Sequence, residues 1–195
     1  MQKIISQEQR ARKQKINQLI IGLVLIGLML FSTIGFAFSN TVQTEDNTET
    51  KNINGIEFIR TGDFWTFSVS GYEFVTKHNP EDVQHISVLT GPTLQSYVGK
   101  PLYFVGENGE HFSEMDGNVR DRFVQRISNA CIDEKDCLEN YPMKNCIDDN
   151  LIVYREAMNE SEKIYFEDNC SYIVSSYANQ SEYADALLFK LLGIK

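Results

Sequence analysis

The sequence lacks the short motifs that mark most enzyme active sites. Its 195 residues contain no H-E-x-x-H, G-x-S-x-G, P-loop or G-x-G-x-x-G pattern, and they include only three histidines. Positive charge is also scarce, because 18 Lys and Arg stand against 27 Asp and Glu, for a formal net charge of −9. An acidic chain repels the phosphate backbone of nucleic acids. We therefore predict no nucleic-acid partner, and no motif indicates a cofactor.

Ionisable groups are absent from one long apolar stretch, residues 19–38. Twenty such residues make about 30 Å of helix, which matches the hydrocarbon core of a bilayer. We predict a transmembrane helix over residues 16–38, in contact with the lipid bilayer. Residues 1–15 form a basic stub with five Lys and Arg and one Glu. Under the positive-inside rule the stub stays cytoplasmic, so the rest of this single-pass protein of the cell membrane lies outside.

A cleaved signal peptide is the alternative for the same stretch. Ala37 and Ser39 are small residues at the spacing that a signal peptidase uses, with cleavage before Asn40. The apolar run is longer than the roughly 7–15 residues of a signal-peptide core, however. No cysteine directly follows the run, which excludes a bacterial-type lipid anchor. We therefore favour an uncleaved signal anchor.

Hydrophobic residues are nearly absent from residues 39–52, which have Val42 as their one aliphatic side chain. Such a segment buries too little surface to offset the entropy of ordering it, so we predict a flexible stalk. Residues 53–195 then form one extracytoplasmic domain.

Two kinds of periodicity alternate along this domain. Aromatic and β-branched runs between turn residues predict strands at 56–60, 64–69, 72–76, 102–105, 151–155, 163–167 and 170–176. Apolar residues at helical spacing predict helices over 113–131 and 183–193, with a shorter one at 93–98. We expect an α+β domain with two antiparallel strand meanders and two or three helices.

Four cysteines lie in the second half of the chain, at positions 131, 137, 146 and 170. An even number in an extracytoplasmic domain predicts two disulfides, and three pairings are open. A hairpin of 151–155 with 163–167 would bring Cys146 close to Cys170 and leave Cys131 for Cys137. Zinc sites and thiol redox centres both favour two cysteines separated by two residues, and that spacing does not occur here. We therefore predict Cys131–Cys137 and Cys146–Cys170.

Candidates for other sites are few. His78, His85 and Asp82 would make a metal site if they converged, although histidines beside carboxylates are more often solvated. Three N-glycosylation sequons begin at Asn159, Asn169 and Asn179. The first lies in the predicted hairpin turn, which suits a glycan, whereas Asn169 precedes a cysteine predicted to be bonded.

Four further segments are distinctive beside the basic stub and the span: residues 54–58, 149–153, 169–170 and 184–193. Together they resemble archaeal single-span membrane-anchored proteins that carry a disulfide-containing ectodomain and have no assigned activity. The resemblance implies location and architecture and supplies no catalytic residues.

The sequence thus predicts a membrane-anchored extracytoplasmic binding or accessory protein, with a membrane or surface protein as partner. One alternative is a membrane-tethered hydrolase or metal-dependent enzyme that uses His78 and His85. Another is a component of a surface filament or coat, which the anchor alone permits.

The signal anchor has a direct test in the mass of the mature chain. Mass spectrometry of protein extracted from membranes is expected to find peptides from residues 1–15, because an uncleaved span retains them. A mature N-terminus at Asn40 would contradict the anchor.

Overall fold

The computed structural model describes residues 16–29, 49–88, 90–106, 109–137 and 140–194. The chain divides into two compact units, Met1–Asp46 and Asn47–Lys195. Residues 16–29 of the first unit are helical. No helix within the described ranges has both the length and the apolarity needed to cross a bilayer. The predicted basic stub, residues 30–38 of the predicted span and residues 39–48 of the predicted stalk lie outside those ranges.

The second unit begins with an antiparallel sheet, here called the N-terminal sheet. Its strands follow chain order: β1 (Thr50–Ile53), β2 (Ile56–Thr61), β3 (Phe64–Val69) and β4 (Tyr72–Thr76). The predicted three-stranded meander is confirmed, and β1 extends it by one strand. The stalk prediction was wrong for residues 50–52, which belong to β1. Asn54 and Gly55, both at positive φ (52° and 81°), form the tight turn that folds this polar segment onto β2.

One face of the N-terminal sheet is lined by aromatic side chains. Phe58, Phe67 and Phe74 are cross-strand partners, with ring centroids 4.5 and 5.5 Å apart. Phe189, from a helix described below, lies 5.7 Å from the ring of Phe67. Aromatic pairs at these separations add to the stability gained from burial alone. This face therefore packs into the interior of the domain.

The remaining strands form a second sheet, here called the C-terminal sheet. They are β5 (Pro101–Val105), β6 (Arg126–Asn129), β7 (Asn150–Glu156), β8 (Lys163–Glu167) and β9 (Cys170–Ser175), in the order β6-β5-β7-β9-β8. All neighbours are parallel except β8, which pairs antiparallel with β9. The predicted second antiparallel meander was therefore wrong. Strand β9 inserts between β7 and β8, and both β7 and β9 are buried along most of their length, as parallel strands usually are.

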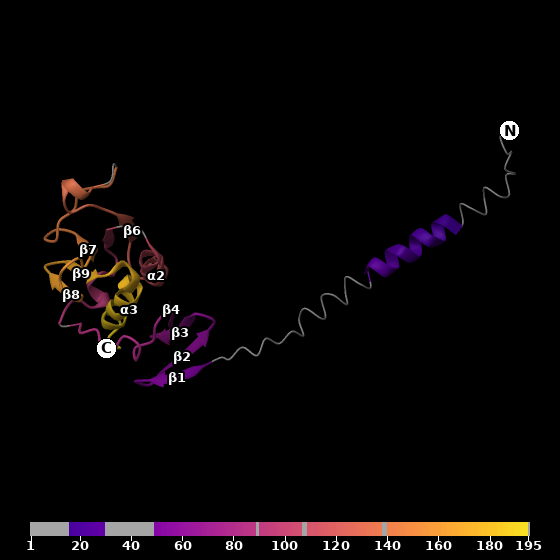
Figure 1. The fold of residues 1–195 in the computed structure, drawn as a ribbon, viewed down its shortest axis with the longest axis horizontal. Coiled ribbons are helices and arrows are strands. Elements are labelled where there is room, and N and C mark those ends of the chain that lie inside the picture. Colours follow the sequence, from indigo (N-terminus) through magenta and orange to yellow (C-terminus); the bar gives the residue numbers. More distant parts are fainter. Residues whose placement is uncertain (1–15, 30–48, 89, 107–108, 138–139, 195) are drawn as a thin grey trace. The chain divides into compact units, whose positions relative to one another are not determined.

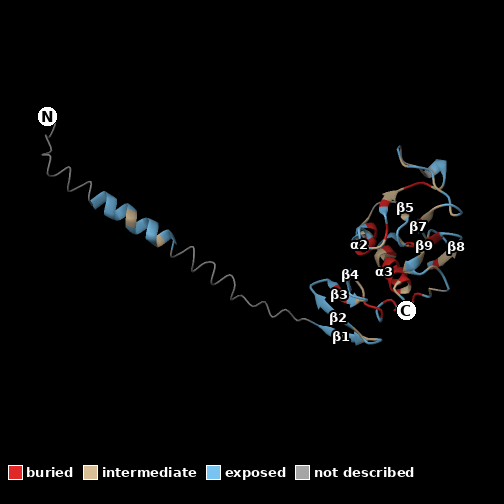
Figure 2. Ribbon diagram, turned by 180° about the vertical axis from the view of Figure 1, so that it is seen from behind, coloured by how far each residue is buried: buried red, intermediate tan, exposed pale blue. Residues whose placement is uncertain are grey.

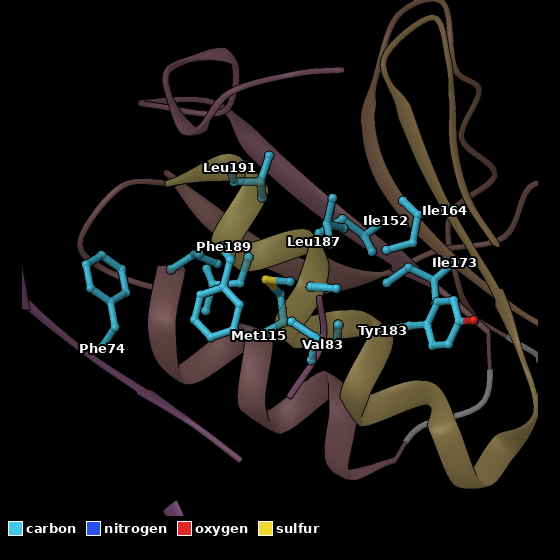
Figure 3. Packing of buried hydrophobic residues seen from close by; sticks show 14 of the residues in the cluster. Phe74, Val83, Met115, Ile152, Ile164, Ile173, Tyr183, Leu187, Phe189 and Leu191 are labelled. Carbon is cyan, nitrogen blue, oxygen red and sulfur yellow. The ribbon is translucent and has the colours of Figure 1, made fainter. Parts of the chain in front are cut away.

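Two helices cover one face of the C-terminal sheet: α2 (Glu110–Val119) and α3 (Gln180–Leu191). Figure 3 shows Met115 of α2 and Leu187 and Phe189 of α3 pointing into the same interior. Buried residues are concentrated along these helices in Figure 2. Short 3₁₀ turns occur at Leu94–Ser96, Glu134–Asp136 and Tyr177–Asn179, the first within the predicted helix 93–98. The expected α+β class is confirmed.

The predicted helix over 113–131 was wrong in its second half. Helix α2 ends at Val119, Arg120 is extended, and Asp121 adopts a positive φ of 58°. Residues 126–129 then pair with β5 as strand β6. Both Val119 and Ile127 are buried nonetheless, because the strand also turns its apolar side chains to the core. The apolar positions were predicted correctly and the local conformation was not.

Both disulfides pair as predicted, Cys131 with Cys137 and Cys146 with Cys170. The reason given for the second pair was incorrect, because β7 and β8 form no hairpin. Strands β7 and β9 start side by side at the same end of the sheet, where Leu151 is the partner of Cys170. The amide of Asn169 also donates to the carbonyl of Cys146, at 2.9 Å. Parallel pairing therefore brings these two cysteines together.

Removing the two disulfides separately should have unequal effects. Cys146–Cys170 closes a sequence separation of 24 residues and Cys131–Cys137 one of 6. The chain-entropy model gives losses of about 3.5 and about 2.4 kcal/mol in the free energy of unfolding. Denaturant unfolding of the two double Cys→Ala variants measures both values, and an equal or reversed order would contradict stabilisation through loop-closure entropy.

Candidate functional site

The outer edge of β4 is held by side chains instead of by another strand. Asn118 of α2 accepts a hydrogen bond from the Val75 amide at 2.9 Å and donates one to the Val75 carbonyl at 2.7 Å. Glu114, one helical turn earlier, accepts from the amide of Lys77 at 2.8 Å. Arg122, four residues after Asn118, donates to the Glu73 carbonyl. We call Glu114, Asn118 and Arg122 the α2 clasp. An exposed strand edge invites pairing with other chains, and the clasp occupies this one.

Helix α3 completes the attachment of the segment after β4. The second carboxylate oxygen of Glu114 accepts a hydrogen bond from the Ser181 hydroxyl. Asp185, one turn further along α3, accepts from both the backbone amide and the Nδ1 atom of His78, each at 2.9 Å. Residues Lys77 and His78 are thereby fixed to α2 and α3, respectively. These contacts join the N-terminal sheet to the helices of the C-terminal sheet.

The two acids of this junction are the buried Asp185 and the half-buried Glu114. Burial, followed by the negative charge of Asp185, raises the pKa of Glu114 to about 7. Burial also raises the pKa of Asp185, although the hydrogen bonds from His78 oppose that rise. The hydrogen bond to Asp185 in turn raises the pKa of His78. All three groups of the junction therefore have raised pKa values, and perturbed pKa values are common at functional sites.

A pocket of about 360 Å³ lies between α2 and strands β3 and β4, and we call it the α2–β4 pocket. Its lining residues are Phe64, Val75, Ser113, Glu114, Gly117, Asn118 and Arg122. Phe64 and Val75 are 41% and 40% exposed, so the pocket presents apolar side chains to solvent. A Cβ atom added at Gly117 would meet no atom within 4 Å, which leaves the helix side of the pocket open.

A second pocket, of about 330 Å³, lies on the other side of α2. It is lined by Phe104, Phe112, Ser113, Asp116, Arg120, Ile127, Ser128 and Asn129. The Arg120 guanidinium and the Asp116 carboxylate form an ion pair in its wall, 2.7 Å apart. The buried acids of the junction do not line this pocket, so the α2–β4 pocket is the stronger candidate.

The three residues proposed for a metal site take separate partners. His78 binds Asp185, the exposed His85 lies 3.6 Å from Glu182, and Asp82 accepts from the Asn79 amide at 2.9 Å. The part of the chain that the structure describes contains no group of three His, Cys, Asp or Glu side chains placed to hold a metal ion. That candidate site is therefore not formed. Of the three residues, His78 alone belongs to the buried junction.

The three sequons differ in how their amide nitrogens are used. The side-chain nitrogen of Asn169 donates to the Ile147 carbonyl at 2.7 Å. That of Asn179 donates to the carboxylate of Glu162, at 3.0 and 3.3 Å. Asn159 is exposed in the connection from β7 to β8. A glycan attaches at this nitrogen, so Asn159 is the best placed of the three, and its glycosylation stays a prediction.

Removing the amide of the α2 clasp should destabilise the domain. The substitution Asn118→Ala leaves the amide and the carbonyl of Val75 without their partners in a region that is partly buried. We expect a loss of about 1–3 kcal/mol in the free energy of unfolding. Trp65 is the single tryptophan of the sequence and lies in β3, so its fluorescence reports the transition. The exposed control Gln84→Ala should change little, and an equal loss in both variants would argue against the clasp.

No protein-family model, curated protein or solved structure matches the chain. The resemblance to archaeal single-span membrane-anchored proteins stays a prediction.

Proposed function

We propose that this chain is a membrane-anchored extracytoplasmic binding protein, and that its α2–β4 pocket receives an apolar side chain of a partner protein. The observation that carries the proposal is the pocket itself. Its apolar side chains are exposed, and its polar lining residues Glu114 and Asn118 are hydrogen-bonded to the backbone beside β4. Concave sites lined by apolar side chains with a few fixed polar groups are the usual form of binding pockets.

The polar groups around the pocket favour binding over catalysis. Both oxygens of Glu114 accept hydrogen bonds, and the amide of Asn118 bonds to the backbone of β4. The Ser181 hydroxyl donates to Glu114, while His78 contacts Asp185. Nucleophilic catalysis would need the hydroxyl that is bonded to a base to face the pocket, and Ser181 is not among the residues that line it. These side chains act together to hold β4, α2 and α3.

The cysteines support the extracytoplasmic location. All four form disulfides, and such bonds persist mainly in oxidising compartments outside the cytosol. The membrane attachment rests on the sequence, with its apolar residues 16–38 behind a basic stub. The two arguments agree, because the stub predicts that the disulfide-bonded unit lies outside.

The surface beside the pocket favours a protein over a small molecule. Ile59, Thr66 and Val75 are cross-strand partners on the outer face of the N-terminal sheet. Ile59 is 37% exposed and Val75 is 40% exposed, so two exposed apolar side chains flank Thr66 on this face. A small ligand would use the pocket alone. A partner protein can place one side chain in the pocket and rest its neighbours on this row.

Site-specific photo-crosslinking in the native cells tests this proposal. Benzoylphenylalanine at Phe64 should give a crosslinked product of one partner, whereas the same probe at Met158, which is 81% exposed and does not line the pocket, should not. The added substitution Gly117→Leu fills the open side of the pocket and should abolish the product. A product that survives Gly117→Leu, that also forms from Met158, or that contains a second copy of this chain would overturn the proposal.

A further inference from the structure

The N-terminal sheet divides its charged residues unevenly between its two faces. Strands β1 to β4 lie at one side of the domain (Figure 1), and Phe58, Phe67 and Phe74 mark the face that packs into the core. Successive side chains of a strand point to opposite faces, so the residues between these positions form the outer face. On that outer face, Glu57 and Glu73 are the charged residues of β1 to β4, and the others are neutral.

Both cations of these four strands, Lys51 and Arg60, belong to the inner face. Their charged groups lie 5.4 and 5.7 Å from the centre of the Trp65 ring, and each also forms an ion pair with a nearby glutamate. Glu57 and Glu73 are exposed, and neither forms an ion pair within the described part of the chain. The outer face therefore carries two negative charges that no cation of the sheet neutralises.

These two acids lie side by side with Ser68, next to the apolar residues that adjoin the α2–β4 pocket. Ser68 is the cross-strand partner of Glu73, and the register of Phe58 with Phe67 places Glu57 opposite Ser68 on its other side. We call Glu57, Ser68 and Glu73 the acidic row. Glu73 precedes Val75, which lines the pocket, by two residues. Two residues span about 7 Å along a strand, so the acidic row and the pocket are within reach of one bound segment.

We propose that the partner segment bound at the α2–β4 pocket is basic, with an apolar side chain in the pocket and a lysine or arginine over the acidic row. The inference rests on the proposed function, because it describes the partner of the same site. In an extended segment, side chains two residues apart point to the same side about 7 Å apart, which matches the distance from the pocket to the acidic row. The net charge of −9 also attracts a basic partner over longer distances.

Arg122, which lines the pocket, acts at the opposite side of β4. Its guanidinium donates to the Glu73 carbonyl from α2, whereas Ser68 pairs with Glu73 from β3. A cation above Ser68 would have Glu57 on one side and Glu73 on the other, and the width of β4 would separate it from Arg122. The local charges therefore favour a cation at the acidic row.

The photo-crosslinking probe at Phe64 tests this inference with a pair of matched variants. Glu57→Gln with Glu73→Gln removes both charges and keeps the side-chain size, so the yield of crosslinked product should fall about three- to tenfold. The control, Glu156→Gln with Glu167→Gln, removes two exposed carboxylates of the C-terminal sheet and should leave the yield unchanged. An equal fall in both double variants would overturn the acidic row, because it would assign the effect to net charge.

Salt and the sequence of the captured peptide give two further measurements. In membranes from the same cells, the wild-type yield should fall as NaCl is raised from about 50 to about 500 mM, because salt shortens the range of exposed charge pairs. Mass spectrometry of the crosslinked peptide should find an apolar residue at the probe with a lysine or arginine two or three positions away. A peptide without a nearby cation would contradict the inference.

The outcomes distinguish failure of this inference from failure of the proposed function. A yield that Glu57→Gln with Glu73→Gln leaves unchanged, but that Gly117→Leu abolishes, would refute the basic partner while the binding function stands. A product that survives Gly117→Leu but is lost in the double variant would refute binding in the pocket while recognition by the acidic row stands. No product from Phe64 in the wild type would refute both.

Discussion

The α2 clasp on the edge of β4 is the contact on which the arrangement of this domain depends. An antiparallel sheet of four short strands has two open edges, and the helix-bearing sheet needs the N-terminal sheet to cover its interior. Glu114, Asn118 and Arg122 close the β4 edge and join the two sheets, because their side chains reach backbone groups of alternate residues, Glu73, Val75 and Lys77. Closing the edge in this way fixes the angle at which the phenylalanines of the N-terminal sheet meet Phe189. The α2–β4 pocket is the space that remains beside the clasp.

The contacts of the segment after β4 with α2 and α3 also explain why the half-buried Glu114 and the buried Asp185 are tolerated. A carboxylate in the interior is costly unless donors surround it. Glu114 has two donors and Asp185 has two, all from the segment after β4 or from α3. Removing either acid would leave unpaired donors, so the junction is sensitive to its own components.

Local features of the sequence could predict the N-terminal sheet, and long-range pairing explains the errors elsewhere. The turns at residues 61–63 and 70–71, flanked by aromatic and β-branched residues, are sufficient to predict β2, β3 and β4, whereas the polar strand β1 gives no such signal. Strands β7 and β9 are apolar on both faces. This pattern indicates that each strand is buried, but it does not indicate which strand lies beside it or whether the two are parallel. The spacing of Met115, Val119, Phe123 and Ile127 suits a helix throughout. The helix nevertheless ends at Val119, and the extended Arg120 and the positive φ of Asp121 lead the chain to residues 126–129, which pair with β5. The disulfide pairing was predicted correctly because β9, in place of β8, supplies the cysteine-bearing end beside β7.

The candidate site was only partly accessible from sequence. His78 stood out as a histidine near acids, but its true partner, Asp185, lies more than one hundred residues away in the chain. A usable signal was present in α3 itself. Asp185 is flanked by Ala184 and Ala186 and followed by Leu187, in a helix whose residues are buried nearly all round. An ionisable group in such a helix must meet a donor or an opposite charge from another element. The sequence therefore implies that Asp185 has a bonding partner in another element. The fold shows that this partner is His78, because the segment after β4 lies against α3.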